Sequence, residues 1–309
     1  MPFTLIQGTF HLVHPAPNGN PTGFEPDGDS VHFKPKKPSS LNLLTKVGQP
    51  FKLSNIGSLN LRLEGIDALE VHFTPQVKGS HLTHQPRPLA DDSRGFLTNE
   101  LGLDPVQYVP PKLTRVKPPA PKDGAPGFIL SRSLDIYGRP VSFVFTGALS
   151  ASDGTPFFLT PAFLKKSLNY KSVLNGFAYP LFYDTLFGEL RAVLGVAAIE
   201  ARTSNPKRGI WRKDKTTNGV VVNDQTDLET NGFIFPKLFR RLSSYLAEGN
   251  NDLSQFLNFP ELTQEQVQDL DPNSPTFTNF THFNTMVRVT GSKVRLRQRP
   301  ETILFISKK

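Results

Sequence analysis

Proline is spread so densely through this chain that it limits the length of any regular element. The 309 residues include 28 prolines and 23 glycines. Proline lacks the N–H that helix interiors and central strands require, and glycine favours turns. Between residues 104 and 127 proline is so frequent that we predict an irregular loop. We therefore expect short strands and some helices joined by many turns, an α+β fold that is mainly β.

The absence of cysteine restricts what can hold this fold together. Without cysteine there are no disulfides and no thiolate metal sites, so a bound metal would need oxygen ligands. The N-terminal residues 1–8 lack a basic region followed by an apolar run, so we expect no secretory signal. No stretch reaches the ~18 apolar residues of a membrane helix. We therefore expect a cytoplasmic protein with no membrane partner.

Hydrophobic periodicity predicts the regular elements. Apolar alternation predicts strands at 3–13, 31–33, 59–66, 128–133 and 141–146, and a terminal hairpin of 286–289 with 293–306. Helical spacing predicts helices at 88–101, 161–176, 185–202 and 236–247. The segment 34–51 is rich in proline, lysine and serine, so we expect an exposed loop there.

Three separate motifs combine acidic residues with arginine. They are Asp27-Gly28-Asp29-Ser30, Arg62 followed by Asp67 and Glu70, and Tyr137-Gly138-Arg139. Carboxylates can hold a divalent cation through oxygen, and guanidinium groups can bind a phosphate bidentately. Each motif alone also has a structural interpretation, because Asp-Gly-Asp favours turns and Arg62 could form an ion pair with Asp67 or Glu70.

These motifs, in this order, resemble those of the staphylococcal nuclease-like (thermonuclease) family. Three later landmarks extend the resemblance over roughly residues 1–214: Leu168-Asn169, Gly176-Phe177-Ala178 and Gly209-Ile210-Trp211. The resemblance implies an OB-like five-stranded barrel of the staphylococcal nuclease type with flanking helices. Within it, 34–51 would lengthen a hairpin and 104–127 would form a proline-rich loop. Residues 215–309 would be a C-terminal extension with one helix and a basic terminal hairpin.

The resemblance also implies a role for each motif residue. Its metal ligands would be Asp29, Asp67 and the backbone carbonyl of Ala68, with Asp27 in the outer shell. Its catalytic residues would be Arg62 and Arg139, which bind phosphate, and Glu70, which orders and deprotonates water. One departure affects the last role, because Leu69 replaces the proline that usually precedes the glutamate and so loosens its loop.

The function implied is a Ca²⁺-dependent nuclease that hydrolyses DNA and/or RNA and leaves 3′-phosphate ends. Its substrate would contact the aromatic side chains of Tyr137, Tyr179, Phe182 and Tyr183. The alternative is a catalytically weak or inactive nucleic-acid-binding or protein-interaction module on the same fold. Salt-dependent binding without cleavage would favour the binding module.

Positive charge is concentrated near the C-terminus. The formal charge is +8, and the last 24 residues hold seven basic residues and one acidic residue. Four of the basic residues recur at every second position and share one face: Lys293, Arg295, Arg297 and Arg299. This face is either a phosphate-binding ridge or a solvated edge strand that charge protects from aggregation.

Two other features have simpler interpretations. His72, His81 and His84 lie close together, but their spacing matches no zinc motif. Trp211 is the single tryptophan, and we expect it to anchor packing.

Overall fold

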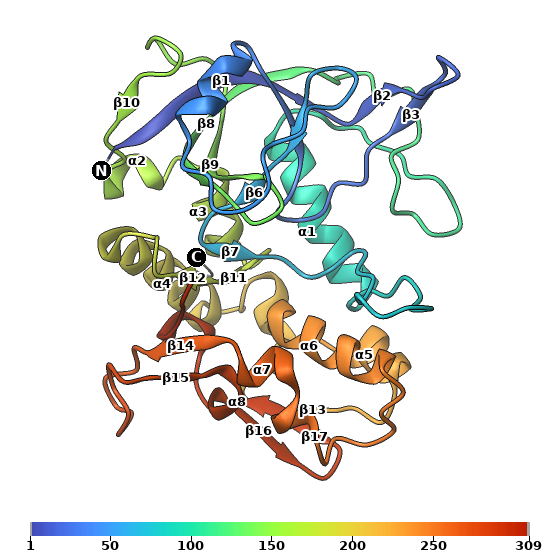
Figure 1. Ribbon diagram of the computed structural model, residues 1–309, viewed down its shortest axis with the longest axis vertical. Helices are drawn as coiled ribbons and strands as arrows, with labels where there is room; N and C mark the ends of the chain where they lie inside the picture. Colours follow the sequence, from blue (N-terminus) through green and yellow to red (C-terminus); the bar gives the residue numbers. More distant parts are fainter. Residues whose placement is uncertain (1, 308–309) are drawn as a thin grey trace. The chain divides into compact units, whose positions relative to one another are not determined.

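The computed structural model describes residues 2–307 and divides them into two units (Figure 1). The first unit comprises residues 2–64 and 94–172, and the second comprises 65–93 and 173–307. The predicted boundary after residue 214 lies inside the second unit. Strands and helices occur in both, which confirms a mixed α+β fold.

Seven strands of the first unit form one sheet. Six of them follow the order β5-β4-β1-β8-β9-β6, and β10 pairs with β1. Their bounds are β1 (Phe3–His11), β4 (His32–Pro35), β5 (Leu59–Asn60), β6 (Arg62–Leu63), β8 (Ala125–Leu134), β9 (Pro140–Thr146) and β10 (Pro156–Phe157). A separate pair, β2 (Val13–Pro15) and β3 (Pro21–Gly23), follows β1.

The two ends of this sheet belong to one continuous segment, because only Leu61 separates β5 from β6. β5 pairs antiparallel with β4, whereas β6 pairs parallel with β9. The Leu61 N–H donates to the Val31 carbonyl at 2.9 Å, and the Glu64 N–H donates to the Ser142 carbonyl at 2.8 Å. Residues 59–64 therefore nearly close the sheet into a barrel, which is compatible with the expected OB-like barrel.

Asn169 attaches a helix to this closing segment. It lies in α3 (Leu168–Leu174), and its side chain is fully buried. Its Oδ1 accepts from the Val144 N–H at 2.9 Å, while its Nδ2 donates to the carbonyls of Glu64 and Ser142 at 2.8 and 3.0 Å. This landmark residue therefore satisfies backbone groups at the barrel closure.

The helices follow the predictions with one exception. α1 (Arg87–Glu100) confirms the helix expected at 88–101. The helix expected at 161–176 is instead α2 (Pro161–Leu164) and α3. Ser167 separates them, because its hydroxyl donates to the Leu164 carbonyl at 2.7 Å and accepts from the Tyr170 N–H at 3.2 Å. It thus ends one helix and caps the next.

The second unit combines helices with three small sheets. Its helices are α4 (Gly188–Thr203), α5 (Gln225–Asn231), α6 (Pro236–Ala247), α7 (Pro260–Thr263) and α8 (Phe283–Met286). Its strands are β7 (Ile66–Asp67), β11 (Tyr179–Pro180), β12 (Phe182–Tyr183), β13 (Val220–Val221), β14 (Gln266–Asp269), β15 (Phe280–His282), β16 (Val287–Thr290), β17 (Lys293–Leu296) and β18 (Ile303–Phe305). α4 and α6 confirm the helices expected at 185–202 and 236–247.

The terminal hairpin is shorter than predicted. β16 and β17 pair antiparallel, but the strand expected at 293–306 ends at Leu296. Pro300 then begins a short 3₁₀ helix, and β18 returns the chain to a different sheet, where it pairs parallel with β12. Segment 34–51 also differs, because Ser40 and Leu41 of its 3₁₀ helix (Pro38–Leu43) are buried.

Among the described residues, none of the helices is both long and apolar enough to cross a membrane.

Candidate active site

Asp67 and Glu70 converge on one arginine in the second unit. Asp67 ends β7 and its side chain is 1% exposed. Arg240 Nη2 donates to Asp67 Oδ2 at 3.0 Å and to Oδ1 at 3.1 Å, while Nη1 donates to Glu70 Oε1. One guanidinium therefore binds both carboxylates that the sequence assigned to metal binding and water activation.

The position of Arg240 follows from the amphipathic pattern of α6. Pro236 starts the helix, and Leu238, Phe239 and Leu242 are buried. The Phe239 ring meets the Phe73 ring edge-on at a centroid distance of 6.3 Å. This contact holds α6 beside the segment that follows β7. Arg240 extends from the same helix to Asp67 and Glu70, which we call the acidic pair.

Gln85 fixes the backbone at Glu70. The Gln85 N–H donates to the Glu70 carbonyl at 2.8 Å, and its Oε1 accepts from the Glu70 N–H at 3.2 Å. Its Nε2 donates to the carbonyls of Gly232 and Ile234, at 2.7 and 2.8 Å, just before α6. Because Leu69 is also fully buried, this loop is anchored although residue 69 is not a proline.

In the first unit, the Asp-Gly-Asp-Ser turn lies beside β6. The Asp27 N–H donates to the Ser30 carbonyl at 3.2 Å, and Asp27 Oδ1 accepts from the Gly28 N–H at 2.8 Å. The Asp29 carbonyl accepts from the N–H of Leu63 at 3.0 Å. Asp29 is therefore bonded to the residue that follows Arg62.

The Tyr-Gly-Arg turn connects β8 to β9. Asp135 accepts from the backbone N–H groups of Tyr137 and Arg139, each at 2.9 Å, and from Arg139 Nε at 2.8 Å. Tyr137 is 65% exposed. Val141 pairs with Arg62 across β9 and β6, so the Tyr-Gly-Arg turn and the Asp-Gly-Asp-Ser turn both lie near Arg62 in this unit, whereas Asp67 and Glu70 of the Arg62 motif belong to the second unit.

The other proposed aromatic contacts are mostly buried. Tyr179 and Phe182 lie in the core, so their rings offer no exposed face for base stacking in this structure. The Tyr179 hydroxyl donates to Asp214 at 2.9 Å, and burial, followed by the Asp214 charge, raises the pKa of Tyr179 well above its ordinary value. Tyr183 is half-buried and its hydroxyl accepts from Lys237 at 2.9 Å.

The basic strand β17 is central, so its interpretation as an edge strand is wrong. β13 and β16 pair with its two sides. Val294 and Leu296 are buried and Lys293 is exposed, as the alternation predicts, but Arg295 and Arg299 are half-buried, and Arg297 and Arg299 lie beyond the end of β17. Arg297 Nε also donates to the Val287 carbonyl at 3.2 Å.

The predicted metal ligands and catalytic residues are divided between the two units. Among residues 2–307 no group of three or more His, Cys, Asp or Glu side chains is arranged to hold a metal ion. Asp67, Glu70 and buried Ala68 lie in the second unit, whereas Asp27, Asp29, Arg62 and Arg139 lie in the first. Convergence of the whole set on one ion stays a prediction.

Sequence reasoning missed Arg240 and Gln85, which bind the acidic pair and its loop. The sequence predicted the helix that carries Arg240, but no motif indicated the partners of this residue. Comparison with known proteins adds no homologous site, because the chain matches no protein-family model and no curated protein.

Proposed function

We propose that this chain is a metal-dependent phosphodiesterase of the staphylococcal nuclease type that hydrolyses DNA or RNA with Ca²⁺. The observation that carries this proposal is the convergence of Asp67 and Glu70 on the Arg240 guanidinium. Carboxylates that face one guanidinium can also face one hard cation. The nearly closed barrel supports the same proposal, and so does the position of Arg62 beside the Asp-Gly-Asp-Ser and Tyr-Gly-Arg turns in the first unit.

The proposed metal ligands are Asp29, Asp67 and the Ala68 carbonyl, with Asp27 in the outer shell. When bound, Ca²⁺ would supply Lewis-acid stabilisation of charge on the phosphate. These residues would hold Ca²⁺ through carboxylate and carbonyl oxygens, the ligands that this cation prefers.

The remaining residues act on the substrate and on water. Glu70 takes a proton from water, whose oxygen bonds to phosphorus as the P–O5′ bond breaks. The leaving O5′ takes up a proton, so the products are a 3′-phosphate and a 5′-hydroxyl. The guanidinium forks of Arg62 and Arg139 bind phosphate oxygens as their charge increases.

Arg240 opposes this reaction in the described arrangement. Its guanidinium uses oxygens of both Asp67 and Glu70. A metal ion must therefore displace Arg240 from Asp67, and Glu70 must be released before it can take a proton. We expect weak Ca²⁺ binding in the wild type and stronger binding once Arg240 is removed.

A cleavage assay tests the proposal. The purified chain is incubated with single-stranded DNA and with RNA in millimolar Ca²⁺, with and without a chelator. We expect chelator-sensitive products that carry 3′-phosphates, and Glu70→Gln should abolish them. Intact polymers with both wild type and Arg240→Gln would refute the enzymatic function.

A second candidate is a nucleic-acid-binding module without catalysis. The ion pairs of Arg240 favour it, because they satisfy the two carboxylates without metal. In that case the chain binds DNA or RNA in a salt-dependent manner, while neither wild type nor Arg240→Gln cleaves it.

Cytoplasmic location is also part of the proposal and affects the choice of metal. Free Ca²⁺ is scarce inside cells, so a cytoplasmic enzyme would be nearly idle or would use another divalent ion. Fractionation of the source cells, combined with activity measured against Mg²⁺ and Mn²⁺, separates these cases.

A further inference from the structure

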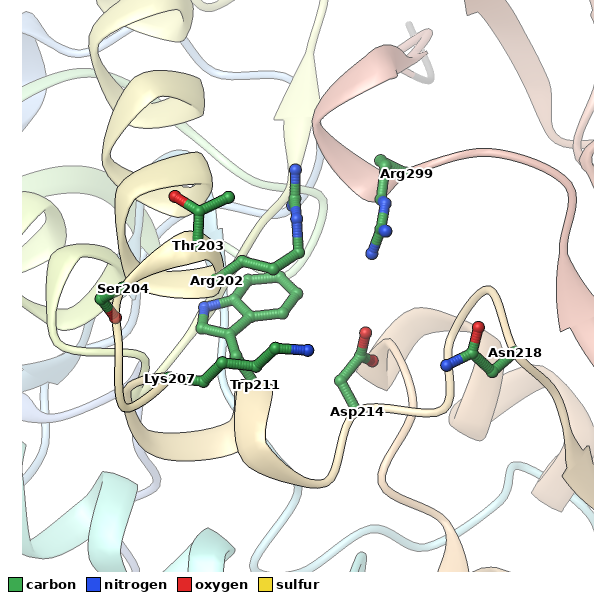
Figure 2. A pocket seen from close by; sticks show the side chains of 8 residues that line it. All are labelled: Arg202, Thr203, Ser204, Lys207, Trp211, Asp214, Asn218 and Arg299. Atoms are coloured by element: carbon green, nitrogen blue, oxygen red, sulfur yellow. The ribbon is translucent and has the colours of Figure 1, made fainter.

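A pocket of about 420 Å³ opens in the second unit, lined by residues between 202 and 218 and by Arg299 (Figure 2). Its volume lies in the ~300–1,000 Å³ range of small-molecule sites. The lining comes from the end of α4, the loop after it, the 3₁₀ helix Gly209–Arg212, the loop before β13 and the residue before Pro300. The residues are Arg202, Thr203, Ser204, Lys207, Trp211, Asp214, Asn218 and Arg299.

Two of the charged residues in this pocket are already engaged. Arg202 forms an ion pair with Glu301 at 2.7 Å, in which the two side chains are only 15% and 7% exposed. Asp214 Oδ1 accepts from the Tyr179 hydroxyl at 2.9 Å and from the Thr216 N–H at 3.0 Å. Both side chains are therefore fixed in place as parts of the wall.

Two further cations in the pocket are available. Within residues 2–307, neither the Lys207 ammonium nor the Arg299 guanidinium has a hydrogen-bond or ion-pair partner. Figure 2 shows both groups directed into the space that Asp214 and Asn218 border. The pocket thus offers two unpaired positive groups and an amide donor to a ligand that carries negative charge.

The polar groups also restrict the class of ligand. A guanidinium fork together with an ammonium suits a phosphate group. Asp214 repels a bare anion, but its carboxylate can accept a hydrogen bond from a hydroxyl. A ligand that carries a phosphate and a nearby hydroxyl satisfies both sets of groups.

We propose that this pocket binds a phosphate monoester of a sugar, with Lys207 and Arg299 holding the phosphate and Asp214 accepting from a sugar hydroxyl. Mononucleotides and simple sugar phosphates share this chemistry. Binding of this ligand requires neither phosphodiester cleavage nor a metal ion.

Trp211 supplies a specific signal for the test. It is the single tryptophan, it lines the pocket, and the Arg202 guanidinium lies 5.4 Å from its ring centroid. Its fluorescence is followed at low salt, with excess chelator, during separate titrations with adenosine 3′-monophosphate, ribose 5-phosphate and inorganic phosphate. We expect saturable changes with the first two ligands and binding of inorganic phosphate at least tenfold weaker. The tighter of the first two identifies the source of the phosphate.

Matched variants distinguish this site from general attraction to a basic protein. Arg299→Gln and Lys207→Gln should each weaken binding roughly tenfold, the size expected for loss of one charge-assisted hydrogen bond. Arg288→Gln removes the same charge from an exposed position of β16 outside the pocket, so its affinity should stay within twofold of the wild type.

Three results would overturn the proposal. They are no saturable change with either sugar phosphate, equal binding of inorganic phosphate, and equal weakening by Arg288→Gln. Unliganded Trp211 emission and thermal unfolding show whether each variant is folded. If a Lys207 or Arg299 variant does not fold, Asn218→Ala takes its place, because Asn218 lines the pocket from an exposed position and its loss should also weaken binding.

Discussion

The guanidinium of Arg240 lies 3.0 Å from the Asp67 carboxylate and also binds Glu70. These partners are separated by more than half of the chain, yet they form one ion-paired cluster in the second unit. A metal ion and Arg240 would need the same oxygen atoms. The stability of the protein should therefore depend on which cation occupies this position.

Removing Arg240 should make stability respond to Ca²⁺. In Arg240→Gln the acidic pair loses its counter-charge, and we expect a loss of about 3 kcal/mol in the free energy of unfolding, as for other broken buried pairs. Ca²⁺ should restore a large part of this loss. The measurement is urea unfolding with and without millimolar Ca²⁺.

Arg241 provides the matched control for that measurement. It neighbours Arg240 but pairs with Glu261 and Glu265, at 2.7 and 3.0 Å. Arg241→Gln should also be destabilised, and Ca²⁺ should not restore its stability. Equal restoration of both variants would show that Ca²⁺ acts elsewhere.

Gln85→Leu should weaken the loop that carries Glu70. The substitution removes the Gln85 donor from the Ile234 carbonyl and the Gln85 acceptor from the Glu70 N–H, whereas the Gly232 carbonyl keeps its bond from the Ile234 N–H at 2.8 Å. Each lost partner of a buried polar group costs ~1–3 kcal/mol. We expect a loss of roughly 2–4 kcal/mol in the free energy of unfolding, and faster hydrogen exchange at the Glu70 N–H. A loss below ~0.5 kcal/mol would show that Gln85 does not anchor this loop.

Asn169→Asp should loosen the closure of the barrel in the first unit. The carboxylate can still accept from the Val144 N–H, but it cannot donate to the carbonyls of Glu64 and Ser142. We expect faster hydrogen exchange at the Glu64 N–H, which bonds across the closure to β9. Unchanged exchange there would contradict the closing role of this helix.

His32 should make the first unit less stable in mild acid. Burial, followed by repulsion from His14 and His11, lowers the pKa of His32 to about 4, below its ordinary value of 6.5. The unfolded chain therefore binds more protons between these values, so stability is full above pH ~6.5 and falls as the pH drops toward 4. In His32→Phe, unfolding free energies measured between pH 7.5 and 4.5 should fall less steeply, and an unchanged slope would contradict this.

Elements with a strong local pattern were predicted well from the sequence. α6 matches its predicted range because Pro236 suits the first helical turn and its apolar residues recur at helical spacing. The alternation around Arg62 likewise located the segment that closes the barrel. These signals depend on residues a few positions apart.

The remaining features depend on contacts between distant segments. The partner of Arg240 lies far along the chain, and a single arginine on a helix does not indicate which carboxylate it will meet. β13, which pairs with β17, has two residues and carries no periodic pattern, so the central position of β17 could not be predicted. Tyr179 lies in β11, which pairs with β7, and no local motif indicates this pairing.

Cleavage of nucleic acid by Arg240→Gln tests the central claim most directly. Single-stranded DNA and RNA are incubated in millimolar Ca²⁺ with wild type, Arg240→Gln, and Arg240→Gln combined with Glu70→Gln. We predict at least tenfold faster chelator-sensitive cleavage by Arg240→Gln than by the wild type, and none by the double variant. Absence of cleavage by all three, or equal cleavage by the double variant, would contradict it.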